Sequence, residues 1–152
     1  MTSLDANVLE QETDMRYMII VKATKDSEAG VMPPEHLIAQ MASFHEELAK
    51  AGVLVDASGL QASSKGWRIH YSGNARTVVD GPFTETKELI AGYTLINVKS
   101  REEALAWTKR FPNPSIDGKE GEIEVRQFFE LEDFGPSAAV DRFRDIEAAN
   151  KS

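Results

Sequence analysis

His45 and Asp80 are the two residues in this chain best placed by type and position for acid–base chemistry. An imidazole and a carboxylate can move protons when they lie within hydrogen-bond reach of each other, directly or through one water. His45 lies on a predicted helix, roughly 80° around from Leu37 at 100° per residue, so it can look into a cleft beneath that helix. Asp80 ends a predicted strand. We predict that they form a catalytic pair; the alternatives are a boundary position for His45 and a turn-forming role for Asp80.

Basic side chains around a predicted hairpin suggest a second kind of chemistry, the binding of an anion. Lys65, Arg68 and Arg76 flank the hairpin, and Lys87 follows it. His70 shares one face of its predicted strand with Arg68 because side chains alternate along a strand. We predict that Arg68, His70 and Lys87 bind a ligand, with a solvated surface as the alternative.

Other kinds of site have little support in the sequence. The chain has no Cys and only three His, which are not clustered, so we predict no metal site. His36, near the start of the first predicted helix, is expected to be exposed. There is no serine nucleophile elbow and no glycine loop that would cradle a phosphate, and we predict no cofactor.

The elements that must position these residues follow from hydrophobic periodicity. The first helix begins near Pro34 and ends at Gly52, and its apolar stripe has steps of four, three and four, at Leu37, Met41, Phe44 and Leu48. Ser100 and Glu103 form a predicted capping box for a second helix, which ends before Pro112. Strands are predicted at 16–23, 53–60, 67–72, 76–80, 89–98 and 122–131, with a Gly73-Asn74 turn joining a hairpin.

Without the hairpin, the order is strand, helix, strand, strand, helix, strand. This order predicts an α+β fold of the ferredoxin-like type, a split βαβ unit whose antiparallel sheet carries both helices on one face. The other face would then be bare. The simplest cover is a second copy, so we predict a homodimer with two sheets stacked face to face; the inserted hairpin and the chain's tail are the alternative covers.

The run Asp80-Gly81-Pro82-Phe83-Thr84-Glu85-Thr86-Lys87-Glu88 resembles the signature of the DGPF, or YCII-related, domain family. Other segments are similar in the same order: Phe44–Leu48 with Ala51–Leu54, Ser64–Gly66, Val98–Ser100 with Glu102–Ala104, and Glu122–Arg126. The likeness spans roughly residues 16–134. In the structural interpretation of the run, Gly81 and Pro82 form a tight turn, Asp80 bonds backbone N–H groups across it, and Phe83 plugs the core.

The resemblance implies a ferredoxin-like domain that dimerises into an α/β barrel around a central cleft. It implies no settled activity, because family members are largely uncharacterised. The wider family includes small proteins with a suspected His–Asp active site, whose histidine lies on the first helix about one turn before His45, near Met41. Other members are linked to alternative sigma factors. The function is therefore either a small dimeric enzyme or small-molecule binder, a regulatory module with a sigma factor as partner, or a purely structural dimer.

Composition and charge bound these possibilities. The chain has 152 residues, 41% of them hydrophobic, and a net charge of −8. This balance suits one globular domain and disfavours direct nucleic-acid or anionic-membrane binding. No apolar run is long enough to span a membrane, and the acidic first residues are unlike a targeting peptide, so a cytoplasmic location is expected. We predict a flexible leader at 1–15, with Met15 as an alternative start, the domain at 16–134, and a helical tail at 135–152.

Overall fold

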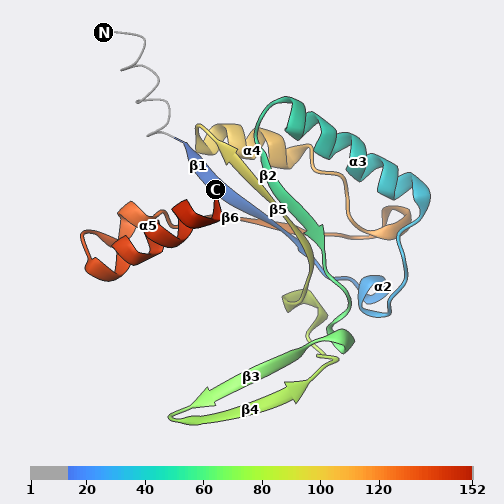
Figure 1. The fold of residues 1–152 in the computed structure, drawn as a ribbon. Helices are drawn as coiled ribbons and strands as arrows, with labels where there is room; N and C mark the ends of the chain where they lie inside the picture. The colour runs from blue at the N-terminus through green and yellow to red at the C-terminus, as the bar shows by residue number, and fades with distance from the viewer. Residues whose placement is uncertain (1–13, 152) are drawn as a thin grey trace.

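A four-stranded antiparallel sheet forms the centre of the computed structural model, which describes residues 14–151. The strand order is β2-β5-β1-β6, so the first and third of these strands in the sequence lie in the middle (Figure 1). The strong β-formers of the predicted runs account for the two central strands. Their bounds are β1 Met15–Lys22, β2 Leu54–Gly59, β5 Ile90–Val98 and β6 Ile123–Gln127.

The first long helix, α3, spans Glu35–Lys50 and is close to the predicted one. Its apolar stripe buries Leu37, Phe44 and Leu48, and the last two belong to the core cluster over the sheet. Pro34 is the N-cap, just before the predicted first-turn position, and Gly52 takes a φ of 75° after the helix end. A glycine suits this left-handed position because it has no Cβ to clash with the backbone.

The second long helix, α4, spans Arg101–Lys109 and starts at the predicted Ser100. The Glu103 N–H donates to the Ser100 hydroxyl at 3.0 Å. The Glu103 carboxylate accepts from the N–H of Lys99 at 2.9 Å, one residue before the position a standard capping box uses. The cap is therefore confirmed, with its second bond shifted by one residue.

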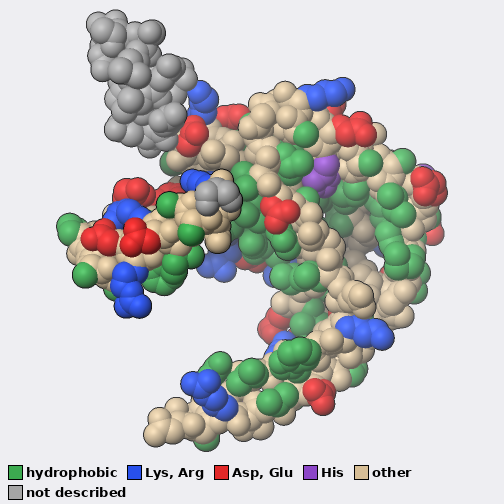
Figure 2. Space-filling model, viewed as in Figure 1, with side chains coloured by type: hydrophobic (Ala, Val, Ile, Leu, Met, Phe, Trp, Pro, Cys, Tyr) green, Lys and Arg blue, Asp and Glu red, His purple; other side chains and the backbone are tan. Residues whose placement is uncertain are grey.

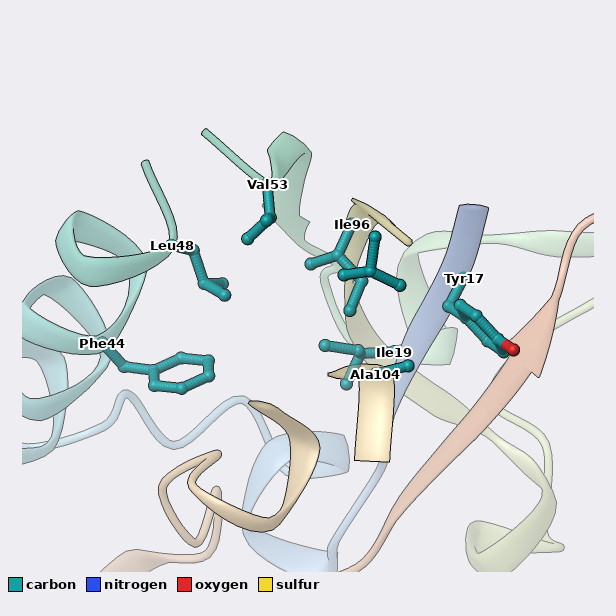
Figure 3. Close-up of a cluster of buried hydrophobic side chains, with 8 residues drawn as sticks. Tyr17, Ile19, Phe44, Leu48, Val53, Ile96 and Ala104 are labelled. Atoms are coloured by element: carbon teal, nitrogen blue, oxygen red, sulfur yellow. The ribbon is translucent and has the colours of Figure 1, made fainter. Parts of the chain in front are cut away.

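One face of the sheet packs against α3 and α4 and holds the hydrophobic core (Figure 3). Phe44 and Leu48 extend from α3 toward Ile19 of β1 and Ile96 of β5, and Ala104 of α4 closes the same layer. Burying such side chains stabilises the fold by about 1.5–3 kcal/mol each. The core comprises Tyr17, Ile19, Phe44, Leu48, Val53, Ile96, Val98 and Ala104.

The other face of the sheet carries no long helix in the described part of the chain. Burial alternates along β5, where Thr94, Ile96 and Val98 are buried and the residues between them are only half-buried. The cross-strand register places Met18 opposite Leu95 and Ile20 opposite Tyr93 on this second face. We call these four residues, Met18, Ile20, Tyr93 and Leu95, the open face.

Two strands outside the main sheet form an arm, β3 Trp67–Ser72 and β4 Ala75–Asp80. Every arm residue in these strands is exposed. Gly73, in the predicted hairpin turn, has a φ of 59°. Figure 1 shows the arm projecting away from α3 and α4. The fold therefore confirms the predicted inserted hairpin and shows that it covers little of its own chain.

The chain ends in a second projecting element. The short 3-10 turn η4 (Leu131–Phe134) follows β6, and α5 (Ala138–Asn150) follows in turn, with the Ser137 hydroxyl accepting from the first N–H groups of the helix. No residue of α5 is buried. The Arg16 guanidinium binds both carboxylate oxygens of Glu130, at 2.8 and 3.0 Å, and ties this segment to β1. This hydrogen-bonded carboxylate raises the pKa of Arg16.

Several short elements lie where the sequence predicted loops or turns. The helix α2 covers only Lys25–Glu28 and is closed by a Thr24–Ser27 capping box. The 3-10 turns are η1 (Ser63–Lys65), η2 (Thr86–Glu88) and η3 (Ile116–Gly118). Four α-helices thus occur among residues 14–151, and the predicted leader lies outside the described residues except for Asp14 and Met15, which begins β1.

Candidate functional site

His45 is held between a helix and a strand. Its Nδ1 lies 2.7 Å from the Met41 carbonyl oxygen and its Nε2 lies 2.8 Å from the Thr94 hydroxyl. A carbonyl can only accept, so Nδ1 donates to Met41, and in the neutral ring Nε2 accepts the Thr94 O–H. Both ring nitrogens therefore have partners, and the side chain connects α3 to β5.

The surroundings of His45 are aromatic and partly dry. Its ring meets the edges of Phe44 and Phe111, with ring centroids 5.7 and 6.0 Å apart. Thr94 is buried, whereas His45 is half-buried. The predicted position at the edge of the helical stripe is confirmed. A proton transfer at His45 would first have to break one of its two hydrogen bonds.

Asp80 lies at the base of the arm, as the last residue of β4 and opposite Trp67. It is exposed, and within the described residues its carboxylate makes no hydrogen bond across the turn that follows. The Gly81 N–H donates to the Gly66 carbonyl at 3.0 Å, a backbone bond that joins the two strands of the arm at its root. The prediction that Asp80 bonds the turn's N–H groups is therefore wrong.

A serine hydroxyl fastens the turn to the body of the protein. The Phe83 N–H donates to Ser63 Oγ at 3.0 Å, and the Ser63 hydroxyl donates to the Glu28 carboxylate. The Ser63 N–H also donates to Glu28, at 2.9 Å. Charge-assisted bonds of this kind are stronger than neutral ones. Sequence reasoning missed Glu28 and Ser63 because they lie 35 residues apart and form no local motif.

Gly81 is required by a close backbone approach. A Cβ built at this position would lie 1.9 Å from the Ser63 carbonyl oxygen, far inside van der Waals contact. The peptide bond between Gly81 and Pro82 is cis. The glycine of the family-like run thus has a packing role at the root of the arm, in line with the structural interpretation.

Phe83 does not plug the core, contrary to prediction. It is half-buried and lies outside the buried cluster beneath α3 and α4. Instead, the Arg68 guanidinium carbon lies 3.7 Å from the centre of its ring, a cation–π contact. The ring of Phe83 thus packs on a side chain of β3 rather than on the core residues. The structure thereby brings together Arg68 and the family-like run, two features the sequence treated separately.

The other predicted ligand-binding residues lie around this contact. His70 has the same strand parity as Arg68, so the two share one arm face, and both are exposed. Lys87 is exposed on η2, just after the turn. Arg76 lies on the opposite arm face, 5.0 Å from the Tyr71 ring centre. The predicted shared face of Arg68 and His70 is confirmed, and its role in binding stays a prediction.

His45 and Asp80 are not brought together within the described residues. His45 is engaged under α3, whereas Asp80 belongs to the arm, which extends away from that helix (Figure 1). A groove of about 880 Å³ lies on another side of α3, between that helix and the segment after α4. Neither member of the proposed pair lines it; its polar residues include His36, Gln40, Glu47, Arg110, Asn113 and Asp117.

Two further observations concern metals and membranes. Between residues 14 and 151, no three His, Asp or Glu side chains are grouped so that they could hold a metal ion. No helix in the same range is both long and apolar enough to cross a bilayer.

The fold and the site define a mixed α+β protein with an antiparallel sheet, two helices on one sheet face, and a hairpin arm rooted in a glycine-proline turn. The family model of the YCII-related domain matches residues 15–132, most of the chain. The chain belongs to the YCII-related family. It is also similar to an uncharacterized protein of Rhizobium meliloti (strain 1021), with 29% identity over 92 residues that cover 60% of this chain and 73% of the relative.

Proposed function

We propose that the protein is a homodimer that binds a small anionic molecule beside the arm. The dimer would join two ferredoxin-like units through their open faces, in an α/β-barrel type of assembly. The strand order β2-β5-β1-β6 with both long helices on one face supports the ferredoxin-like comparison. The apolar character of Met18, Ile20 and Leu95 supports a second sheet as the cover.

The observation that carries the ligand proposal is the position of Arg68. The guanidinium carbon of Arg68 lies 3.7 Å from the centre of the Phe83 ring. At this distance the guanidinium contacts the ring through one of its flat faces. The N–H donors point outward in the plane of the group and match the paired oxygens of a carboxylate or a phosphate. Within the described residues, no hydrogen bond or ion pair uses these donors. His70 and Lys87 would supply further donors around the same anion.

Local charge supports an anion at this place on an acidic protein. Residues 63–87 carry four bases, Lys65, Arg68, Arg76 and Lys87, against two acids, Asp80 and Glu85. The segment has a net charge of +2, whereas the whole chain has −8. A local positive potential raises the concentration of an anion near the arm.

Acid–base catalysis by His45 and Asp80 is the alternative with less support. Both ring nitrogens of His45 are already bonded, to Met41 and Thr94, and Asp80 is not among the groups that contact its ring. An interaction module is a second candidate, favoured by the exposed Phe143 and Ile146 on α5. In that case an alternative sigma factor is the proposed partner. A purified sigma factor should then bind the full chain but not a chain that lacks residues 138–152.

The dimer is tested by sedimentation at micromolar concentration. We expect a dimer for the parent and a monomer for Leu95→Glu. Stacking of the two open faces would bury the new carboxylate without an opposite charge beside it, which is costly. Leu105→Glu is the matched control on α4, where the side chain is already exposed. A monomeric parent, or equal effects of the two variants, would contradict the open-face dimer.

The ligand is tested by calorimetric titration with inorganic phosphate and with citrate. Arg68→Gln should weaken binding at least tenfold, whereas Arg101→Gln, at an exposed site on α4, should leave it unchanged. Binding that is equal in the two variants would show that the anion lies elsewhere.

A further inference from the structure

Two apolar patches lie on the two projecting elements of the molecule, the arm and the tail. The arm patch comprises Trp67, Ile69, Tyr71 and Val78, which the register places on one face of β3–β4. The tail patch comprises Phe129, Phe134, Phe143 and Ile146. The exposed fractions of these eight side chains range from 45% to 71%. Exposed apolar clusters of this kind mark interaction surfaces.

Each patch is organised rather than scattered. In the arm, Ile69 lies opposite Val78, and Tyr71 lies opposite Arg76, whose guanidinium contacts its ring. In the tail, the Phe129 and Phe134 rings are 5.2 Å apart, and Phe143 and Ile146 are one turn apart on α5. A two-stranded hairpin is only marginally stable in water by itself, so the arm gains most from a cover.

The arm and the tail carry net charges of opposite sign. Residues 63–80, the arm with its root, carry three bases and one acid, a net charge of +2, and of these Arg76 and Asp80 lie on the face of the arm patch. Residues 129–150, the tail, carry six acids and two bases, a net charge of −4. Of the tail's acids, Glu130 is already bonded to Arg16, so the tail still holds an excess of negative charge. Opposite potentials of this kind orient two surfaces toward each other.

The two patches do not meet within one chain. Every residue of β3 and β4 is exposed, and no residue of α5 is buried. Figure 2 shows the arm and the tail on either side of an open concavity. Among residues 14–151, therefore, no other part of the chain covers either patch.

We propose that the arm patch of one copy packs on the tail patch of its partner, and that the reciprocal contact forms at the same time. This inference rests on the proposed open-face dimer. When two sheets stack face to face, a two-fold axis can run between them, parallel to both sheets and perpendicular to the direction from arm to tail. That axis places each arm opposite the partner's tail, so one symmetric interface satisfies both patches.

Cysteine cross-linking tests the contact cleanly because the chain has no Cys. Val78→Cys and Ile146→Cys are made in separate chains, mixed, and oxidised, and the products are read on a non-reducing gel. Both sites are more than half exposed, so neither substitution removes a core contact. We expect an arm-to-tail cross-linked pair to form at least tenfold faster than a Val78→Cys pair with Gln40→Cys, an exposed control on α3.

A charge exchange gives an independent readout in the dimer dissociation constant. Arg76→Glu should weaken the dimer about tenfold, and Glu147→Arg in the same chain should restore most of the loss. Glu147 lies one position after Ile146, roughly 40° from Phe143 around α5, on the side of the tail patch. It also attracts Arg16 of its own chain, so Glu147→Arg in the parent is the control for the loss of that attraction.

The outcomes separate this inference from the proposed function. A parent chain that is monomeric at every concentration overturns the dimer and the arm-to-tail contact together. A dimer that Leu95→Glu breaks but Arg76→Glu does not weaken, with no preferred arm-to-tail cross-link, overturns the contact alone. A chain with both cysteines that closes within itself while monomeric also overturns it, because the tail would then cover its own arm.

Discussion

The two faces of the four-stranded sheet differ in how their apolar side chains are covered. On the face under α3 and α4, apolar side chains such as Ile19 and Ile96 are fully buried, and the polar pair His45–Thr94 is hydrogen-bonded. On the other side, the open face is half-buried, and the arm and tail expose large apolar side chains. The chain therefore covers one sheet face with its own helices, and in the proposed dimer a second copy would cover the other.

The largest expected difference is in the free energy of unfolding, when one isoleucine is replaced by alanine in the core and one in the arm. Ile96→Ala should lower the free energy of unfolding by about 2–5 kcal/mol, because Ile96 is 0% exposed and its loss leaves a cavity. Ile69→Ala in the arm, where the side chain is 45% exposed, should change it by no more than about 0.5 kcal/mol. Urea unfolding on the monomeric Leu95→Glu background measures both.

The same experiment at a concentration where the parent is dimeric sharpens the comparison. Ile69→Ala should then cost more than on the Leu95→Glu background, because in the proposed dimer the partner's tail would bury the arm patch. An equal cost in monomer and dimer would mean that the arm stays uncovered.

The next effect concerns the polar connection under α3. His45→Ala removes the partner of the buried Thr94 hydroxyl and should cost about 1–3 kcal/mol in urea unfolding. His36→Ala, at an exposed site on the same helix, should stay within about 0.5 kcal/mol. Thr94→Val removes the hydroxyl as well, so the double variant should lose less than the sum of the single ones. Equal costs for the two histidines would contradict a structural role for His45.

A smaller and more local effect is expected at the root of the arm. Ser63→Ala removes the hydroxyl that accepts from Phe83 N–H and donates to Glu28, at a cost of about 0.5–1.5 kcal/mol. Hydrogen exchange should show faster exchange of the Phe83 amide. Exchange under α3 and α4 should stay unchanged because local opening does not involve the core. Ser64→Ala, at the exposed neighbouring position, is the control, and the same pattern in both variants would exclude the Ser63 bond as the fastener.

The smallest effect is expected where the tail meets β1. Arg16→Gln breaks the paired bonds to Glu130, but both side chains are about a third exposed, at 35% and 37%, so the cost should be about 0–1 kcal/mol and should fall with added salt. Because the pKa of Arg16 is raised in the folded protein, this contribution is present at neutral pH and is lost as the pH rises into strong alkali. Arg101→Gln on α4 is the control. A loss that persists in molar salt would point to packing on Phe128 instead.

The sequence predicted the regular elements because their signals are local. The stripe from Leu37 to Leu48 and the capping pair Ser100–Glu103 lie within one helix each, and the Gly73-Asn74 turn lies within one hairpin. The short helix α2 was missed because four residues hold no full period of an apolar stripe.

The candidate site was less predictable because its contacts join distant parts of the chain. Thr94 lies 49 residues from His45, and Ser63 lies 35 residues from Glu28. Phe83 was expected in the core from its apolar type alone, but the arm brings Arg68 over its ring. Hydrophobicity indicates that a side chain needs cover, and only the three-dimensional arrangement shows which group provides it.

The central position of β1 has a consequence for the protein's synthesis. This strand is the first regular element of the described chain to be made, and its two neighbours, β5 and β6, end at Val98 and Gln127. At about 5–20 residues per second, the ribosome takes roughly 5–20 s to pass from the end of β1 to the end of β6. Until β5 has been made both hydrogen-bonding edges of β1 are open, and until β6 has been made one edge stays open, so a chain that ends before β6 would expose an edge of its central strand.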